Sequence, residues 1–187
     1  HVTVRCPSNP DHFLIQPYGL FFNEVTASSL LKIDADCNII QKGSTPYGVT
    51  RSGFLLHSAI HRARPDVHAV LHIHTGLAAG LSCLKYGFLP LSQDHLITGP
   101  VSYHDYTGIF EDDPVLLKRL TDDLGPTNKV LVCRNHGLVV CGSTLEECWY
   151  LTVYFMWSAN VQFNALAAAG GDLDKLVMPP KETIDQV

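Results

Sequence analysis

Several features that would assign a chain to a membrane, nucleic-acid-binding or nucleotide-binding class are missing from this sequence. Its apolar runs all end well before the roughly 20 residues that a transmembrane helix needs. It has no block of lysine or arginine, and its formal net charge is −5, which argues against nucleic acid as a partner. It also has no Gly-x-Gly-x-x-Gly fingerprint. We therefore predict no transmembrane segment, no nucleic-acid partner and no dinucleotide cofactor.

Closely spaced cysteine pairs of the Cys-x-x-Cys type are absent too, although the chain has six cysteines. Several of them lie in apolar segments, where a free cysteine behaves as a small hydrophobic residue. In a chain of 187 residues this pattern favours a reducing, cytoplasmic setting over a disulfide framework. No signal-peptide pattern opens the chain, and its first residue is His1, so we expect a fragment whose upstream elements are missing.

What the chain does contain is the composition of a globular domain. Apolar residues make up 46% of the sequence and charged residues 17%, which argues against disorder. A length of 187 residues suits one domain with a substantial core. We therefore predict a single domain over residues 1–187. Residues 177–187 contain two prolines and are expected to form an extended tail.

Two kinds of apolar period alternate along this domain. Short β-favouring runs predict strands, partly with loops, at residues 13–15, 30–34, 38–41, 69–74, 95–103, 130–133 and 138–141. Helical periods and caps predict helices at residues 52–64, 76–85, 114–124 and about 145–169, the last one opened by a capping box at Ser143–Glu146. Residues 25–29 are ambiguous and are also compatible with a helical turn. Hairpin-like strands near the start favour an α/β domain with a mixed or antiparallel sheet.

Three histidines stand where apolar strands are predicted to end. His72 and His74 close the run Ala69–Thr75, and residues two apart in a strand point to the same face. His136 ends a second apolar strand, directly before Gly137. Three histidines are a common ligand set for a catalytic zinc ion, which keeps a fourth position open for water or substrate. The pattern therefore predicts a shared divalent-metal site at His72, His74 and His136.

Each of these histidines, taken alone, is more often a hydrogen-bonded core or loop residue than a metal ligand. The metal hypothesis therefore depends on the His-x-His pair and the later histidine occurring together. Two other histidines have no assigned role. His57 shares a predicted helix face with Gly53 at a spacing of four residues, and His104 lies in the aromatic-rich segment Tyr103–Tyr106.

Longer motifs accompany these histidines. Leu56–Ile60, Arg64–Asp66, Leu71–His74 and Asn135–Gly137 together resemble the class II aldolase/adducin family, over nearly the whole chain. A second set resembles the adducin branch of that family more closely: Asp11–Ile15, Tyr18–Leu20, Val25–Leu30, Tyr103–Tyr106 and Ala168–Gly171. The resemblance implies a three-layer α/β/α fold with a mixed, largely antiparallel central sheet. It also implies that an N-terminal helix is missing from this chain.

The resemblance further implies a Zn²⁺ site, because the aldolases of this family bind zinc through three histidines that match His72, His74 and His136. Those enzymes use a glutamate as acid and base, four residues before the histidine that matches His57. This chain has Gly53 there, which carries no side chain and cannot transfer a proton. His57, one turn along the same helix, either partly fills this gap or only forms hydrogen bonds within the fold. Loss of a general base costs typically ~10²–10⁴-fold in rate. The zinc site is therefore expected, whereas the family's aldol cleavage is in doubt.

Two functions follow from the resemblance. The first is an adducin-like head domain, a cytoplasmic, oligomerising scaffold of the spectrin–actin cytoskeleton without aldolase activity and with a vestigial metal site. The fold implies a homo- or hetero-oligomer, typically a tetramer. The second is a zinc-dependent class II aldolase or epimerase-type lyase acting on a small sugar phosphate. Turnover of a sugar phosphate and metal content are the observations that separate them.

Overall fold

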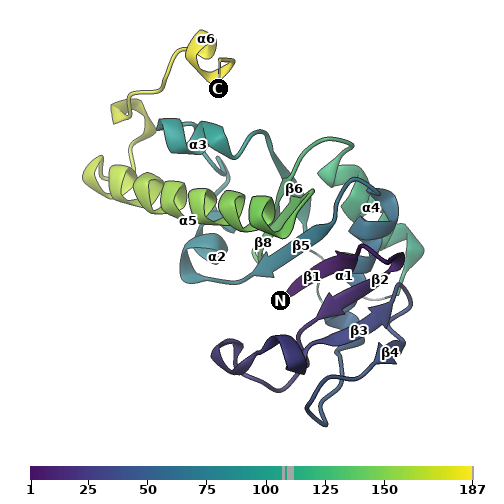
Figure 1. The fold of residues 1–187 in the computed structure, drawn as a ribbon. Helices are drawn as coiled ribbons and strands as arrows, with labels where there is room; N and C mark the ends of the chain where they lie inside the picture. Colours follow the sequence, from purple (N-terminus) through teal and green to yellow (C-terminus); the bar gives the residue numbers. More distant parts are fainter. Residues whose placement is uncertain (107, 109–111, 187) are drawn as a thin grey trace.

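An eight-stranded sheet forms the centre of the molecule (Figure 1). The computed structural model describes residues 1–106, 108 and 112–186. The strand order is β4-β3-β2-β1-β5-β8-β7-β6, and neighbours are antiparallel except for the parallel pair β6 and β7. The strands are β1 (Val2–Cys6), β2 (Asn9–Ile15), β3 (Leu31–Asp34), β4 (Ile39–Gln41), β5 (Ala69–Ile73), β6 (Val101–Asp105), β7 (Val130–Arg134) and β8 (Gly137–Gly142). The predicted mixed, largely antiparallel sheet is confirmed.

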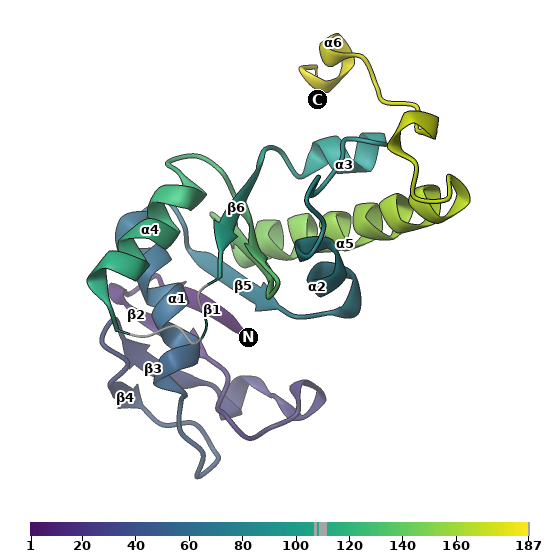
Figure 2. The same cartoon turned by 180° about the vertical axis from the view of Figure 1, so that it is seen from behind.

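Helices cover both faces of the sheet, as Figures 1 and 2 show. One core cluster joins β5, β7 and β8 to helices α2 and α5, and α3 packs against α5. A second cluster joins the opposite face of these strands to helices α1 and α4. The helices are α1 (Arg51–Ala63), α2 (Gly76–Ser82), α3 (Gln93–Ile97), α4 (Pro114–Leu124), α5 (Leu145–Ala168) and α6 (Lys181–Ile184). The expected three-layer α/β/α arrangement is therefore confirmed.

Side chains along β5 alternate between the two core clusters, and this alternation determines on which face of the sheet His72 lies. Ala69 and Leu71 belong to the cluster beneath α2 and α5, whereas Val70 belongs to the cluster beneath α1 and α4. Alternate residues of a strand point to opposite faces, so His72 follows Val70 to the α1 side, where it is buried. The end of β5 therefore presents an imidazole beneath the first turn of α1.

Helix α5 begins one residue away from the predicted capping box. Thr144 is the N-cap and accepts a hydrogen bond from the Glu147 N–H at 3.0 Å. The Glu147 carboxylate reaches back to the Ser143 N–H at 2.7 Å, so Glu147 takes the position that the sequence assigned to Glu146. In the part of the chain that the structure describes, no helix, α5 included, is long and apolar enough to cross a membrane.

Strand β1 is absent from the sequence predictions. Its alternation is masked because the buried face carries the polar Thr3, which is fully buried, and because Arg5 follows it. Residues 93–97 form helix α3, although strand and loop were expected over 95–103, and only the later part, β6, is a strand. The local reason is a turn in which the His95 N–H bonds to the Ser92 carbonyl at 3.0 Å.

Two further boundaries differ at the ends of helices. Helix α2 stops at Ser82, and the Cys83 N–H turns back to the Gly80 carbonyl at 3.2 Å, which tightens the last turn. The segment predicted as an extended tail contains the single helical turn α6 after Pro180, with an ion pair between Lys181 and Asp185 on its surface. The last residue of that predicted tail, at position 187, lies outside the described residues.

Candidate metal site

The three candidate histidines reach one place from two strand ends. His72 lies in β5, His74 directly follows this strand, and His136 lies in the tight turn between β7 and β8. Asn135 adopts a left-handed conformation with φ +57°, which turns the chain within two residues. Asparagine tolerates that conformation better than most side chains do. The turn therefore places His136 beside the end of the neighbouring strand β5.

Gly137 allows this close approach. A Cβ atom at position 137 would lie 2.5 Å from the Ile73 carbonyl oxygen and 3.1 Å from the His74 ring. Only a residue without a side chain fits there while β8 keeps its register with β5, in which Ile73 pairs with Leu138. Gly137 therefore controls the spacing between His74 and His136.

We expect Gly137→Ala to destabilise the fold by about 2–3 kcal/mol, because overpacking of a buried position costs about that much and the obstacle here is backbone. Gly76→Ala is the matched control, since its Cβ would meet no atom within 4 Å. Urea unfolding of both variants measures the difference. Equal stability of the two variants would contradict the role given to Gly137.

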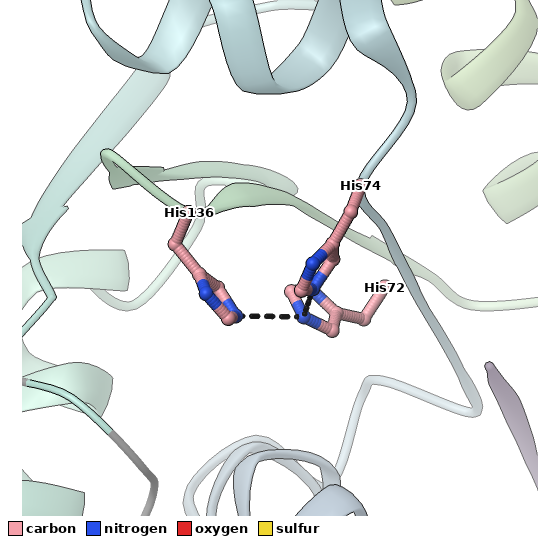
Figure 3. Close-up of side chains that lie close together, drawn as sticks. All are labelled: His72, His74 and His136. Carbon is pink, nitrogen blue, oxygen red and sulfur yellow. Dashed lines mark hydrogen bonds between the residues drawn. The ribbon is translucent and has the colours of Figure 1, made fainter.

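The three imidazoles converge through their Nε2 atoms (Figure 3). The Nε2 atoms of His74 and His72 lie 2.6 Å apart, and those of His72 and His136 lie 3.1 Å apart. One nitrogen from each ring lies within 4.8 Å of the others, which is the arrangement that a single ion requires. The structure thus brings together all three residues that the sequence singled out.

The protonation of His72 is determined by a backbone carbonyl. Its Nδ1 lies 2.9 Å from the Leu138 carbonyl oxygen, which can only accept a hydrogen bond. Nδ1 therefore carries the proton, and Nε2 presents a lone pair to the other two rings. Metal-ligating histidines are typically oriented by such a bond from the second ring nitrogen.

Burial keeps this cluster neutral. It lowers the pKa of His72 to about 3, with a further contribution from the neighbouring His74 and His136. Burial also lowers the pKa of His136 to about 4, and it lowers the pKa of His74. At neutral pH the three rings are therefore uncharged, which is the form that binds a metal ion.

A cavity of about 160 Å³ opens beside the three histidines. The other residues that line it are His1, Ser52, Gly53, Leu56 and Tyr106. The Tyr106 ring stacks on His136 with centroids 3.9 Å apart. None of the lining residues in the part of the chain that the structure describes is an aspartate or a glutamate, so none of them replaces the carboxylate that is missing at Gly53.

His57 does not enter this cavity. It is fully buried, with Nδ1 2.8 Å from the Thr3 hydroxyl and Nε2 2.6 Å from His1 Nδ1. His104 lies in the edge strand β6, where it is buried and pairs with Asp123 of α4 at 2.7 Å. The sequence did not indicate that His1 lines the cavity, because strand β1, which begins at the next residue, was itself not predicted.

Comparison with known proteins shows to which family the chain belongs. The family model described as "Class II Aldolase and Adducin N-terminal domain" matches residues 1–163. The chain belongs to the class II aldolase and adducin family. Within this family, α-adducin of Rattus norvegicus is 44% identical over 182 residues, which cover 96% of this chain and 24% of that protein. An adducin-related protein of Schizosaccharomyces pombe is 42% identical and covers 100% of this chain and 58% of its own length.

Solved structures of the family share the fold closely. An aldolase II superfamily protein from Pseudomonas syringae superimposes with a TM-score of 0.91 at 40% identity, over 100% of this chain and 72% of that chain. An L-fuculose 1-phosphate aldolase from Glaciozyma antarctica gives a TM-score of 0.83 at 27% identity, over 99% and 69%. The chain is thus an adducin-like head domain, and it spans about a quarter of the rat adducin that it matches.

Proposed function

We propose that this adducin-like domain is a cytoplasmic, oligomerising scaffold of the spectrin–actin cytoskeleton, without aldolase activity. The observation that carries the proposal is Gly53 in a cavity whose described lining contains no carboxylate. A family enzyme needs an acid and base at this point, and its absence costs typically ~10²–10⁴-fold in rate. The similarity to adducins at 42–44% identity supports the same function.

The surface of α5 supports self-association. Trp149 and Trp157 are 62% and 63% exposed, and Val153 lies between them on the same face of the helix. The three line shallow apolar cavities. Large aromatic residues of this kind are enriched in protein interfaces. We therefore place the contact between subunits on this face of α5.

We expect the double substitution Trp149→Glu and Trp157→Glu to convert the oligomer to a monomer, because charges replace two aromatic anchors that the proposed subunit contact would bury. Val115→Glu is the control, since Val115 is an exposed apolar residue of α4 on another surface. Sedimentation velocity measures the mass of each species. An oligomer that survives the double substitution would contradict this interface.

Turnover and partner binding test the scaffold itself. The chain should cosediment with actin filaments in the presence of spectrin, and it should cleave no phosphorylated ketose at any added zinc concentration. Robust aldol cleavage that a chelator abolishes would overturn the proposal. Failure to cosediment, with a folded and oligomeric chain, would count against the cytoskeletal role.

We further propose that His72, His74 and His136 are ligands for Zn²⁺. Zn–N bonds of about 2.0–2.1 Å in a tetrahedral site separate the ligand nitrogens by about 3.3 Å. The Nε2 atom of His72 lies 2.6 Å from that of His74 and 3.1 Å from that of His136, so these two distances need only lengthen slightly. The neutral rings and the oriented His72 fit such an ion. When bound, zinc acts as a Lewis acid toward an oxygen ligand.

The second candidate function is a zinc-dependent aldolase or epimerase-type lyase acting on a small sugar phosphate. The complete histidine set favours it, as does the similarity to an L-fuculose 1-phosphate aldolase. It requires a proton acceptor other than residue 53. Metal-dependent turnover, lost in His136→Ala, is the result that would establish it in place of the scaffold.

A further inference from the structure

His1 is positioned by the sheet next to the histidine cluster. The His72 N–H donates to the His1 carbonyl at 2.9 Å, and the His1 nitrogen donates to the His72 carbonyl at 2.8 Å. Two residues that exchange both bonds are directly opposed in an antiparallel ladder, so their side chains share one face of the sheet. The two rings accordingly lie with centroids 5.1 Å apart.

The His1 ring borders the space that a side chain at position 53 would enter. A Cβ atom built on Gly53 would have His1 Nε2 as its nearest neighbour, at 3.6 Å. Both residues line the cavity beside the histidine cluster. The room left by the missing glutamate on α1 is therefore bordered by an imidazole nitrogen of the residue directly before β1.

A chain of hydrogen bonds determines which nitrogen of His1 carries the proton. It starts at the Val67 carbonyl, which accepts from His61 Nδ1 at 3.2 Å. His61 Nε2 must then accept, and the Thr3 hydroxyl donates to it at 2.9 Å. Because the Thr3 proton is used there, its oxygen accepts from His57 Nδ1 at 2.8 Å.

The last step of this relay reaches the cavity. His57 Nε2 has no proton once Nδ1 carries it, so it accepts from His1 Nδ1 at 2.6 Å. His1 Nε2 is then left with a lone pair, next to Gly53. The relay ends at a carbonyl, which takes up no proton, so it orients the His1 ring and conducts no proton away.

We propose that His1 is a ligand-contacting residue of this cavity, whose Nε2 accepts a hydrogen bond from a hydroxyl group bound beside the three histidines. The relay through His57, Thr3 and His61 is its positioning device. This inference goes beyond the scaffold proposal, because it concerns the ligand chemistry of the cavity and holds for a scaffold or an enzyme. The ligand class is a hydroxylated small molecule, such as a hydroxycarboxylate, whose O–H points to His1.

The tautomers can be measured directly. Two-bond ¹H–¹⁵N spectra of the ¹⁵N-labelled chain, expressed with a methionine ahead of His1, distinguish Nδ1–H from Nε2–H for each imidazole. We expect His1, His57 and His61 all to carry the proton on Nδ1, with the exposed His68 as an internal reference. A His1 ring that carries its proton on Nε2 would overturn the proposal.

Replacing Thr3, whose hydroxyl lies between His57 and His61, tests the relay. Thr3→Val removes the hydroxyl at nearly constant volume, and we expect the two His1 nitrogen signals to move toward each other as both tautomers become populated. Thr3→Ser retains a hydroxyl and should restore the separation seen in the original chain. Unchanged His1 signals in a folded Thr3→Val variant would refute the relay. The His1 tautomer itself is read from the spectrum of the original chain, so that result does not depend on the variant.

Ligand contact is tested with glycolate and acetate, which share a carboxylate and differ in one hydroxyl. With zinc added, glycolate should shift the His1 Nε2 signal and acetate should not. The His1→Ala variant should bind glycolate about fivefold more weakly than the original chain does, which is the loss expected for one hydrogen bond. It should bind acetate as well as the original chain does. Equal responses to both acids, including no response to either, would contradict the contact. Cosedimentation with actin is unaffected by any of these outcomes, so this inference can fail separately from the scaffold proposal.

Discussion

Replacing His72 with alanine is expected to weaken Zn²⁺ binding by at least about 100-fold, more than the loss of an outer-shell partner typically costs. His72 is the central ring of the cluster, since its Nε2 lies within 3.1 Å of both other nitrogens. It is also the ring whose orientation is maintained by the Leu138 carbonyl. Removing it leaves two ligands, which cannot complete a three-histidine site.

Calorimetric titration with Zn²⁺ and mass spectrometry of the intact chain measure this effect. The original chain should hold about one ion, and His72→Ala should hold none at micromolar zinc. His68→Ala is the matched control, because His68 is an exposed histidine just before the same strand and outside the cluster. A His72→Ala variant that retains one tightly bound ion would exclude the proposed ligand set.

The second large effect is a loss of stability in mild acid. Burial lowers the pKa of His61 to about 3 and that of His72 to about 3, against 6.5 for an ordinary histidine. Below pH 6.5 the unfolded chain binds protons that these folded rings do not bind. Stability is therefore fully present above pH 6.5 and falls as the pH drops toward 3.

By pH 5 each of these two histidines should have cost about 2 kcal/mol of folding free energy. Together that is a large part of the about 5–15 kcal/mol that stabilises a typical domain. His57 is fully buried and its pKa is lowered as well, so it adds to the same trend. Unfolding by urea at pH 7.5, 6 and 5, in the presence of a chelator, measures the slope.

His61→Gln provides the comparison. Glutamine keeps a polar side chain near Thr3 and the Val67 carbonyl but does not titrate, so the decline in stability between pH 7.5 and 5 should become shallower by about 2 kcal/mol. The same substitution at the exposed His68 is the matched control. Identical slopes for the original chain and His61→Gln would show that His61 is not the group responsible.

Much of the fold could be predicted from local signals. Helix α4 begins at Pro114 behind the N-cap Asp113 and ends before Gly125, whose φ of +78° suits a residue without a side chain. The hairpin of β3 and β4 also lies where its pattern indicated, and the ambiguous segment 25–29 contains a helical turn at Ala27–Ser29, one of the alternatives left open. These signals succeed because capping and turn chemistry depend on residues within a few positions of one another.

Strand β1 and helix α3 could not be recognised in this way. β1 has polar residues on the face that the fold buries, and Thr3 is acceptable there because two histidine rings bond to its hydroxyl. Those partners lie 54 and 58 residues further along the chain. A burial pattern that depends on such distant partners leaves no periodic signal in its own segment.

By itself, the sequence determined the family, the order of strands and helices along most of the chain, and the three histidines at two strand ends. Each of these is written in contiguous motifs, since local backbone preference and side-chain period are short-range properties. Only the tertiary structure decided that His1 stands beside Gly53. That contact arises because His1 pairs with His72 where β1 runs beside β5, 71 residues apart in the chain. Such a pairing depends on the order and register of the strands in the sheet, and a short stretch of sequence does not determine either of them.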